Sequence, residues 1–174
     1  TTAGYADFIQ MSGCKGKIDI SNCTFSNPHD DPINVHGTFN QVVEVINNKT
    51  FKVRFMHNET AGFPNFFVGD TVEFTKMSTL LPVENSTAKV VKVDGPDGEG
   101  GKGSSNSLTD IIVTLDKEIP GIQANQHAIE NITYTPEVHI HDNVFKETPT
   151  RGILVTTRKP VLIENNTFDG MGMS

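Results

Sequence analysis

The segment IDISNCTF (residues 18–25) recurs twice later in the chain, as VHIHDNVF (residues 138–145) and as VLIENNTF (residues 161–168). Each copy has aliphatic residues at its first and third positions, Asn or Asp at its fifth and Phe at its eighth. The last two copies start 23 residues apart, a plausible length for one coil of a parallel β-helix, whereas the first two start 120 residues apart. The repeat therefore predicts an all-β fold in which right-handed parallel β-helix coils are interrupted by a domain-sized insertion.

A second repeated strand supports the same period. INV (residues 33–35) begins 15 residues after the start of the first copy, and ILV (residues 153–155) begins 15 residues after the start of the second. In both, two aliphatic residues point inward and the residue between them points outward. Two ladders are then expected across the copies: stacked rings at Phe25, Phe145 and Phe168, and left-handed turn residues at Asn22, Asp142 and Asn165. An all-antiparallel sandwich is the alternative architecture.

Composition excludes several classes of partner. The 174-residue chain has a formal net charge of −7 and no basic stripe, so nucleic acid is a poor partner. No run approaches the roughly 18 apolar residues of a membrane span. The first residues, TTAGYADF, lack the charged and apolar regions of a signal peptide. Cys14 and Cys23 could pair, but Cys23 takes the ladder position of Asn143 and Asn166, which predicts a buried thiol.

The insertion differs in character from the segments around it. QVVEVINNKTFKVRF (residues 41–55) alternates apolar and polar residues on both sides of a polar turn, which predicts a β-hairpin. Further strands are expected over residues 69–75, 88–94 and 110–116, and a Gly- and Ser-rich loop over residues 95–107. With no helix signal, these strands predict a small antiparallel β-barrel or sandwich over residues 41–136, inserted between β-helix coils of residues 1–40 and 137–174.

Two acidic residues lie just before one repeated strand, in HDDPINVHG (residues 29–37). Aligning the preceding ADFIQMS (residues 6–12) with this strand places Asp7 beside Asp31 at a period of 24, or beside Asp30 at a period of 23. In the following coil, Arg151 takes the position of Asp31. Because neighbouring coils lie about 4.8 Å apart, three carboxylates and a guanidinium are expected to converge.

This convergence suggests hydrolysis of a glycosidic bond. Carboxylates that lie close together disfavour one another's ionisation, so one is expected to hold its proton. A protonated acid beside an ionised one can protonate a leaving oxygen while its partner attacks or activates water. A solvated turn and a calcium site are the alternatives, and Arg151 argues against calcium. No metal or cofactor is predicted; Asn34, His36 and Arg151 are candidates for binding sugar hydroxyls, although a surface His is often only solvated.

HDDPINVHG, the stretch RGILVTTRKPVLIENNTF (residues 151–168) and the β-rich insertion between them together resemble glycoside hydrolase family 110. The resemblance covers the whole chain as an internal fragment, and it implies a bacterial, inverting α-1,3-galactosidase that releases terminal α-galactose from glycans. It further implies Asp7 as the general acid and Asp30 and Asp31 as the pair that activates water. A periplasmic or secreted location follows from the same resemblance.

Two other functions remain open. A polygalacturonase-like hydrolase also joins a solenoid to paired aspartates, and a non-catalytic carbohydrate-binding β-helix would need no acid–base pair. Two or three coils are a short stack whose ends expose strand edges, so we expect a longer protein or a homo-oligomer to cover them. A sugar pocket on such a surface spans several coils, which predicts that the isolated fragment is a poor enzyme.

Overall fold

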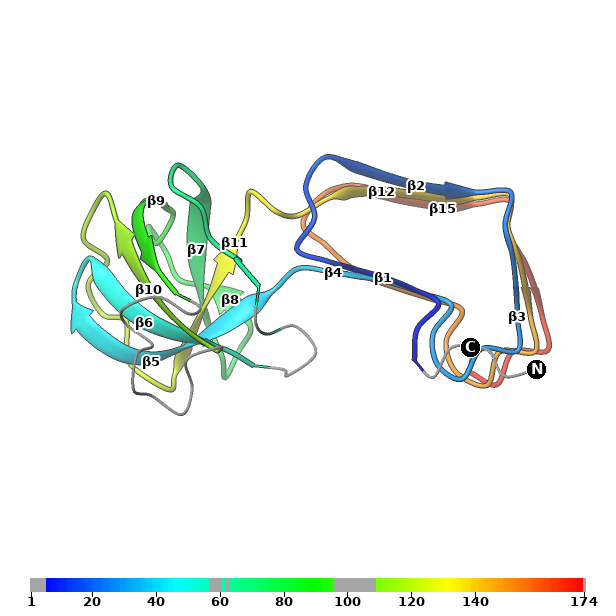
Figure 1. Cartoon of the computed structure of the whole chain (residues 1–174), viewed down its shortest axis with the longest axis horizontal. Coiled ribbons are helices and arrows are strands. Elements are labelled where there is room, and N and C mark those ends of the chain that lie inside the picture. Colours follow the sequence, from blue (N-terminus) through cyan, green and yellow to red (C-terminus); the bar gives the residue numbers. More distant parts are fainter. Residues whose placement is uncertain (1–5, 57–60, 62, 96–108, 174) are drawn as a thin grey trace. The chain divides into compact units, whose positions relative to one another are not determined.

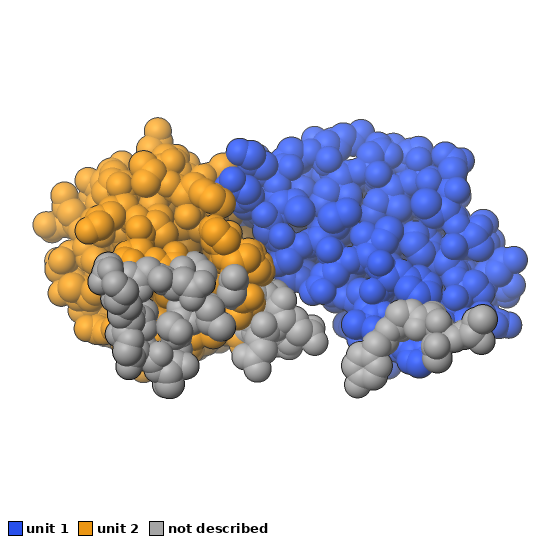
Figure 2. Space-filling view, in the orientation of Figure 1, with its two compact units in different colours: residues 1–37, 134–174 blue, residues 38–133 orange. Residues whose placement is uncertain are grey.

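The computed structural model describes residues 6–56, 61, 63–95 and 109–173. It divides the chain into two compact units, one formed by Thr1–Gly37 and Tyr134–Ser174 and the other by Thr38–Thr133 (Figure 2). Every regular element of the described residues is a β-strand, which confirms the predicted all-β class. Among those residues, no helix is long and apolar enough to cross a membrane. The unit boundaries lie three residues before the positions 40 and 136 expected from the sequence.

The first unit contains three parallel sheets of three strands each (Figure 1). Sheet A comprises β1 (Ile9–Ser12), β4 (Ile33–His36) and β14 (Ile153–Thr156). Sheet B comprises β2 (Lys17–Ser21), β12 (Glu137–His141) and β15 (Val161–Glu164). Sheet C comprises β3 (Thr24–Ser26), β13 (Val144–Lys146) and β16 (Thr167–Asp169). The chain visits sheets A, B and C in this order, and the second unit is inserted between β4 and β12.

The repeated segments pair with one another in register. Val138 of β12 lies opposite Ile18 of β2 on one side and Val161 of β15 on the other. In sheet A, Ile33 lies between Ile9 and Ile153. Residues that occupy the same position in the repeated segments therefore lie side by side on neighbouring strands of one sheet.

Both predicted ladders are present in the first unit. The ring centroids of Phe25 and Phe145 are 5.0 Å apart and those of Phe145 and Phe168 are 4.8 Å apart, with the rings stacked. Phe8 extends the stack, 6.4 Å from Phe25. The turn residues have left-handed backbones, with φ of 56° at Asn22, 54° at Asp142 and 53° at Asn165. Asn and Asp suit this geometry because their short polar side chains tolerate the left-handed region.

The expectation of a buried thiol at Cys23 is wrong. Both cysteines are free, and Cys23 is exposed while Asn143, in the same ladder position, is buried. The reason is position within the stack: β2 and β3 are edge strands of their sheets, whereas β12 and β13 are central. Cys23 still takes part in the ladder through its backbone N–H. Cys23 N donates to Asn143 Oδ1 at 3.0 Å, just as Asn143 N donates to Asn166 Oδ1 at 3.0 Å.

The second unit is a closed antiparallel barrel. Its six strands are β5 (Phe39–Asn47), β6 (Thr50–Phe55), β7 (Thr71–Lys76), β9 (Ala88–Asp94), β10 (Asp110–Leu115) and β11 (His127–Asn131). They follow the order β11-β5-β6-β10-β9-β7, and β7 pairs back to β11 to close the ring. The short β8 (Leu81–Pro82) adds a further antiparallel pairing to β7. Of the two architectures expected for the insertion, the structure has the barrel.

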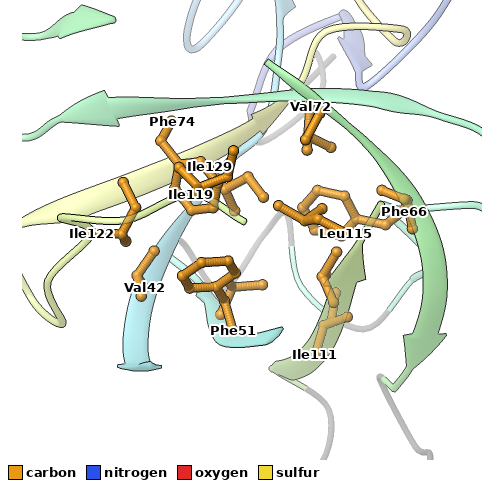
Figure 3. Packing of buried hydrophobic residues seen from close by; sticks show 14 of the residues in the cluster. Val42, Phe51, Phe66, Val72, Phe74, Ile111, Leu115, Ile119, Ile122 and Ile129 are labelled. Atoms are coloured by element: carbon orange, nitrogen blue, oxygen red, sulfur yellow. The ribbon is translucent and has the colours of Figure 1, made fainter. Parts of the chain in front are cut away.

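The barrel interior is filled by aliphatic and aromatic side chains (Figure 3). Phe51 and Phe74 are fully buried and their ring centroids are 4.9 Å apart. The alternating pattern predicted the β5–β6 hairpin and strands β7, β9 and β10 correctly, but it missed β11. All five residues of β11 are buried, among them the polar His127, Glu130 and Asn131, so this strand shows no alternation. Most of the predicted loop over residues 95–107 lies outside the described residues.

Candidate functional site

Sheet A brings together the acidic residues that lie far apart in the sequence. Ile9 pairs with Ile33 and Phe8 N donates to Asp31 O at 3.4 Å, so Asp7 lies beside Asp31, as the period of 24 requires. On the other side of β4, the pairing of Ile153 with Ile33 places Arg151 beside Asp31. Three successive strands of one parallel sheet thus supply Asp7, Asp31 and Arg151 from the residues just before each strand.

The three carboxylates lie close enough to act together. Asp7, Asp30 and Asp31 each offer an oxygen atom, and these atoms all lie within 4.8 Å of one another. Asp31 is buried, at 1% exposure, whereas Asp30 is nearer the solvent. Asp30 Oδ1 accepts a hydrogen bond from Asp31 N at 2.9 Å, which fixes the turn between the two acids. The cluster therefore has one deeply anchored carboxylate and more accessible ones beside it.

Arg151 holds Asp31 through both carboxylate oxygens. Arg151 N and Nε donate to Asp31 Oδ1 at 3.1 and 3.3 Å, and Nη2 lies 2.9 Å from Oδ2. This fork geometry fixes the plane of the carboxylate as well as its position. The Arg151 side chain is 54% exposed, so the face of the guanidinium not used by Asp31 is open to solvent. The structure thus makes Arg151 first of all a positioning residue for Asp31.

Asn34 and His36 lie on the outward side of β4, as predicted, and both have partners. Asn34 Nδ2 donates to Asp7 Oδ2 at 2.9 Å, and Asn34 Oδ1 is buried with no hydrogen-bond partner among the described residues. His36 Nδ1 lies 2.8 Å from Gly37 O and therefore donates to it. His36 Nε2 is then the acceptor for Gln10 Nε2, 3.4 Å away.

Sequence reasoning missed Gln10 as a member of this site. Gln10 pairs with Asn34 in the β1–β4 register and lies next to His36. The same alignment that placed Asp7 beside Asp31 would have placed Gln10 beside Asn34, so the signal was present. The arrangement as a whole offers carboxylates, an amide oxygen and a guanidinium at the start of the three strands of sheet A, which suits a polyhydroxylated ligand.

Part of the inserted unit is similar to a known protein family. Residues 50–96 match the protein family described as GLAA-B beta-barrel domain II. This match covers strands β6, β7, β8 and β9, and it agrees with the closed barrel described above.

The whole chain is similar to glycoside hydrolases. It is 50% identical to an alpha-1,3-galactosidase A of Streptomyces avermitilis over 100% of this chain and 28% of that protein. It is also 50% identical to an alpha-1,3-galactosidase A of Peterkaempfera griseoplana, over 99% of this chain and 24% of that protein. A third relative, from Bacteroides thetaiotaomicron and of the same name, is 47% identical over 100% of this chain and 29% of its own length.

These matches confirm the predicted resemblance to the α-1,3-galactosidases of glycoside hydrolase family 110. The chain spans about a quarter of the length of the curated relatives it matches.

Proposed function

We propose that this chain is a segment of a glycoside hydrolase that removes terminal α-1,3-linked galactose from glycans. The observation that carries the proposal is the convergence of Asp7, Asp30 and Asp31 within 4.8 Å in a chain similar along its length to proteins named alpha-1,3-galactosidase. Crowded carboxylates in differing environments are the groups that glycosidic cleavage requires.

The environments of the three acids support separate roles. Asp7 is assigned as the general acid that protonates the leaving oxygen, and its side chain is oriented by Asn34. Asp30 and Asp31 are assigned as the pair that activates water. Asp31 is fixed by Arg151, and Asp30 is the more accessible member through which water contacts the pair. Asn34 Oδ1, His36 and the open face of Arg151 are assigned to sugar hydroxyls.

The reaction is proposed to invert the anomeric centre, on the strength of the family resemblance. Inverting enzymes hold their carboxyl groups about 6.5–9.5 Å apart so that a water fits, against about 5–5.5 Å in retaining ones. The closest oxygens here lie within 4.8 Å of one another. Inversion therefore requires Asp7 to turn away from Asp30 and Asp31 and towards the glycosidic oxygen when the sugar binds.

The first unit is proposed to be part of a right-handed parallel β-helix. The support is the order in which the chain visits sheets A, B and C and the in-register pairing within each sheet. A glycan substrate would lie along the outward face of sheet A, and a protein with such a substrate is proposed to act in the periplasm or outside the cell.

The test is a chimera in which this chain replaces the matching segment of the Streptomyces avermitilis alpha-1,3-galactosidase A, to which it is 50% identical. We expect the chimera to release galactose from the methyl glycoside of an α-1,3-linked galactobiose, whose second sugar cannot mutarotate, with β-galactose as the first free anomer in proton NMR spectra. Early α-galactose would overturn inversion. A folded chimera that binds the sugar without cleaving it would overturn the hydrolase assignment and favour a binding role.

Two comparisons complete this experiment. The isolated chain of 174 residues is expected to release no galactose, and turnover by it would show that the rest of the relatives' length is dispensable. If the full exchange prevents folding, the exchange is confined to Thr1–Gly37 and Tyr134–Ser174, which carry all the assigned residues.

A further inference from the structure

The outward face of sheet B carries a second cluster of chemically active side chains, separate from the acids beside sheet A. His139 and His141 are alternate residues of β12, so both project from the same face of the sheet. Strand β2 lies next to β12 (Figure 1), and its Asp19 is opposite His139 in the parallel register. Asp19, His139 and His141 each offer a ligand atom, and these atoms lie within 4.8 Å of one another.

Both imidazoles face Asp19 with one nitrogen and a different carboxylate with the other. His141 Nε2 lies 3.2 Å from Asp19 Oδ1, and His141 Nδ1 lies 2.6 Å from Asp142 Oδ2. His139 Nδ1 lies 3.5 Å from Asp19 Oδ2, and His139 Nε2 lies 3.0 Å from Glu164 Oε1. The two rings stack with centroids 4.1 Å apart.

These contacts resemble the way in which neighbouring carboxylates hold metal-binding histidines. A histidine that binds a metal generally donates its other N–H to a carboxylate or carbonyl, which fixes the tautomer and the ring orientation. Asp142 and Glu164 occupy that outer position for His141 and His139, and the nitrogens left over converge on Asp19.

We propose that Asp19, His139 and His141 bind a divalent transition-metal ion of the Zn²⁺ type, with Asp142 and Glu164 holding the two imidazoles in place. Two imidazole nitrogens and one carboxylate are donors that suit zinc and its neighbours rather than calcium or magnesium. With Zn–N distances of about 2.0–2.1 Å, ligand atoms at the corners of a tetrahedron lie about 3.4 Å apart. His141 Nε2 lies 3.2 Å from Asp19 Oδ1 and His139 Nδ1 lies 3.5 Å from Asp19 Oδ2, so each imidazole is near this spacing from one of the two Asp19 oxygens.

The ion would join two strands that the insertion separates. Asp19 precedes the barrel in sequence and the two histidines follow it, so the metal connects β2 to β12 across 120 residues of chain. β2 is one of the two edge strands of sheet B, and a ligand that binds the folded sheet but not the unfolded chain stabilises that edge. The role inferred for the ion is therefore structural and independent of the proposed hydrolase activity.

One neighbour opposes binding. Lys17 Nζ lies 3.2 Å from Asp19 Oδ2 and brings a positive charge to the site. Its side chain is half exposed, so it can swing into solvent when the ion arrives. Replacing Lys17 with Gln should therefore strengthen metal binding, a change opposite in direction to that of removing a ligand.

The experiment is calorimetric titration of the full chain, freed of metal with a chelator, with Zn²⁺. We expect one ion per chain, and we expect H139Q and H141Q to weaken binding by tenfold or more. D142N, which alters only the outer shell, should weaken binding by about 10–100-fold. K17Q should bind more tightly than the parent, and H29Q, which changes an exposed histidine outside the cluster, should bind equally well.

A second readout removes dependence on any single variant. Zn²⁺ should raise the melting temperature of the parent in a concentration-dependent way, and this rise should be absent in H141Q. Circular dichroism before titration confirms that each variant is folded. Equal affinity of the parent and H139Q, or no binding by the parent and K17Q, would overturn the proposal.

Discussion

Asp31 is the most firmly anchored residue of the candidate site, since Arg151 contacts both of its carboxylate oxygens. We predict that Asp31→Asn in the active chimera lowers kcat about 10²–10⁴-fold, the usual effect of losing one acid–base group. The amide preserves size and one accepting oxygen, so the circular dichroism spectrum should not change. Asp169→Asn on the exposed β16 is the matched control and should retain activity. A kcat near that of the unmodified chimera would remove Asp31 from the proposed chemistry.

His141 provides a prediction about pH. Its hydrogen bond with Asp142, followed by that with Asp19, raises the pKa of His141 above the ordinary value of 6.5. A raised folded-state pKa contributes stability that is complete below the unfolded pKa and is lost as the pH rises through the folded pKa. The His141 contacts should therefore stabilise the fold fully at low pH and lose this effect as the pH rises through the raised pKa. NMR titration of metal-free protein should give a His141 pKa above 6.5, and Asp142→Asn should lower that pKa. An unchanged pKa in Asp142→Asn would show that this contact does not form in solution.

Some residue positions could be predicted from sequence and others could not. Asp7, Asp31 and Arg151 could be placed together because, in a parallel sheet, aligning the inward residues of two strands aligns every other residue as well. The bond from Asn34 to Asp7 depends on side-chain conformations, which an alignment does not specify. Asn34 is therefore both a candidate ligand contact and the residue that orients the proposed acid.

At the scale of secondary-structure elements, the asparagine ladder holds adjacent turns of the first unit together. Asn143 Oδ1 accepts from Cys23 N, and Asn143 Nδ2 donates to Ile20 O at 2.9 Å. Asn143→Ala leaves these backbone groups without their partners, and each such loss costs about 1–3 kcal/mol. We predict a destabilisation of at least about 1–3 kcal/mol, the cost of one such loss, measured by urea unfolding.

Cys23→Ala is the matched control for this ladder prediction. Cys23 occupies the equivalent position, but only its backbone takes part in the contact with Asn143. The control should therefore change stability by less than about 0.5 kcal/mol, as is usual for exposed positions. Equal effects of the two substitutions would show that the Asn143 side chain adds nothing specific.

Element prediction succeeded where hydrophobic residues alternate and failed where polar groups are buried. Strand β10 has an interior of Ile111, Val113 and Leu115, and its pattern was sufficient to locate it. Strand β11 buries Asn131, whose Nδ2 donates to Asp70 Oδ2 at 2.7 Å and to Asn65 O at 2.9 Å. Because these partners come from distant parts of the chain, no local pattern could have indicated that Asn131 is an interior residue.

At the scale of the whole molecule, the insertion could be located from the spacing of the repeats. The first two copies start 120 residues apart and the last two only 23 residues apart, so a domain-sized insertion had to lie between the first two. The closure of that domain could not be foreseen, because it depends on the pairing of β11 with β7 and the sequence did not reveal β11.

The barrel brings its own two ends together. Phe39, the first residue of β5, lies directly opposite Glu130, near the end of β11. When the barrel has folded, the segment that follows β4 and the segment that precedes β12 are joined to neighbouring residues of the barrel. The 120 residues between Ile18 and Val138 then behave as a much shorter connection. On the logarithmic dependence of loop closure on length, this lowers the entropic cost of pairing β2 with β12 by on the order of 1 kcal/mol.

Because the folded barrel lowers this entropic cost, we predict that the barrel folds first. Sheets A, B and C then form after the long segment between β4 and β12 has already been closed by the barrel. Phe51→Ala removes a fully buried side chain of the barrel and should delay amide protection in both units, whereas Phe145→Ala should delay only the first. Pulse-labelling hydrogen exchange with peptide resolution separates the two cases. Protection of β2 and β12 at an unchanged rate in Phe51→Ala would mean that the first unit closes its long loop without help.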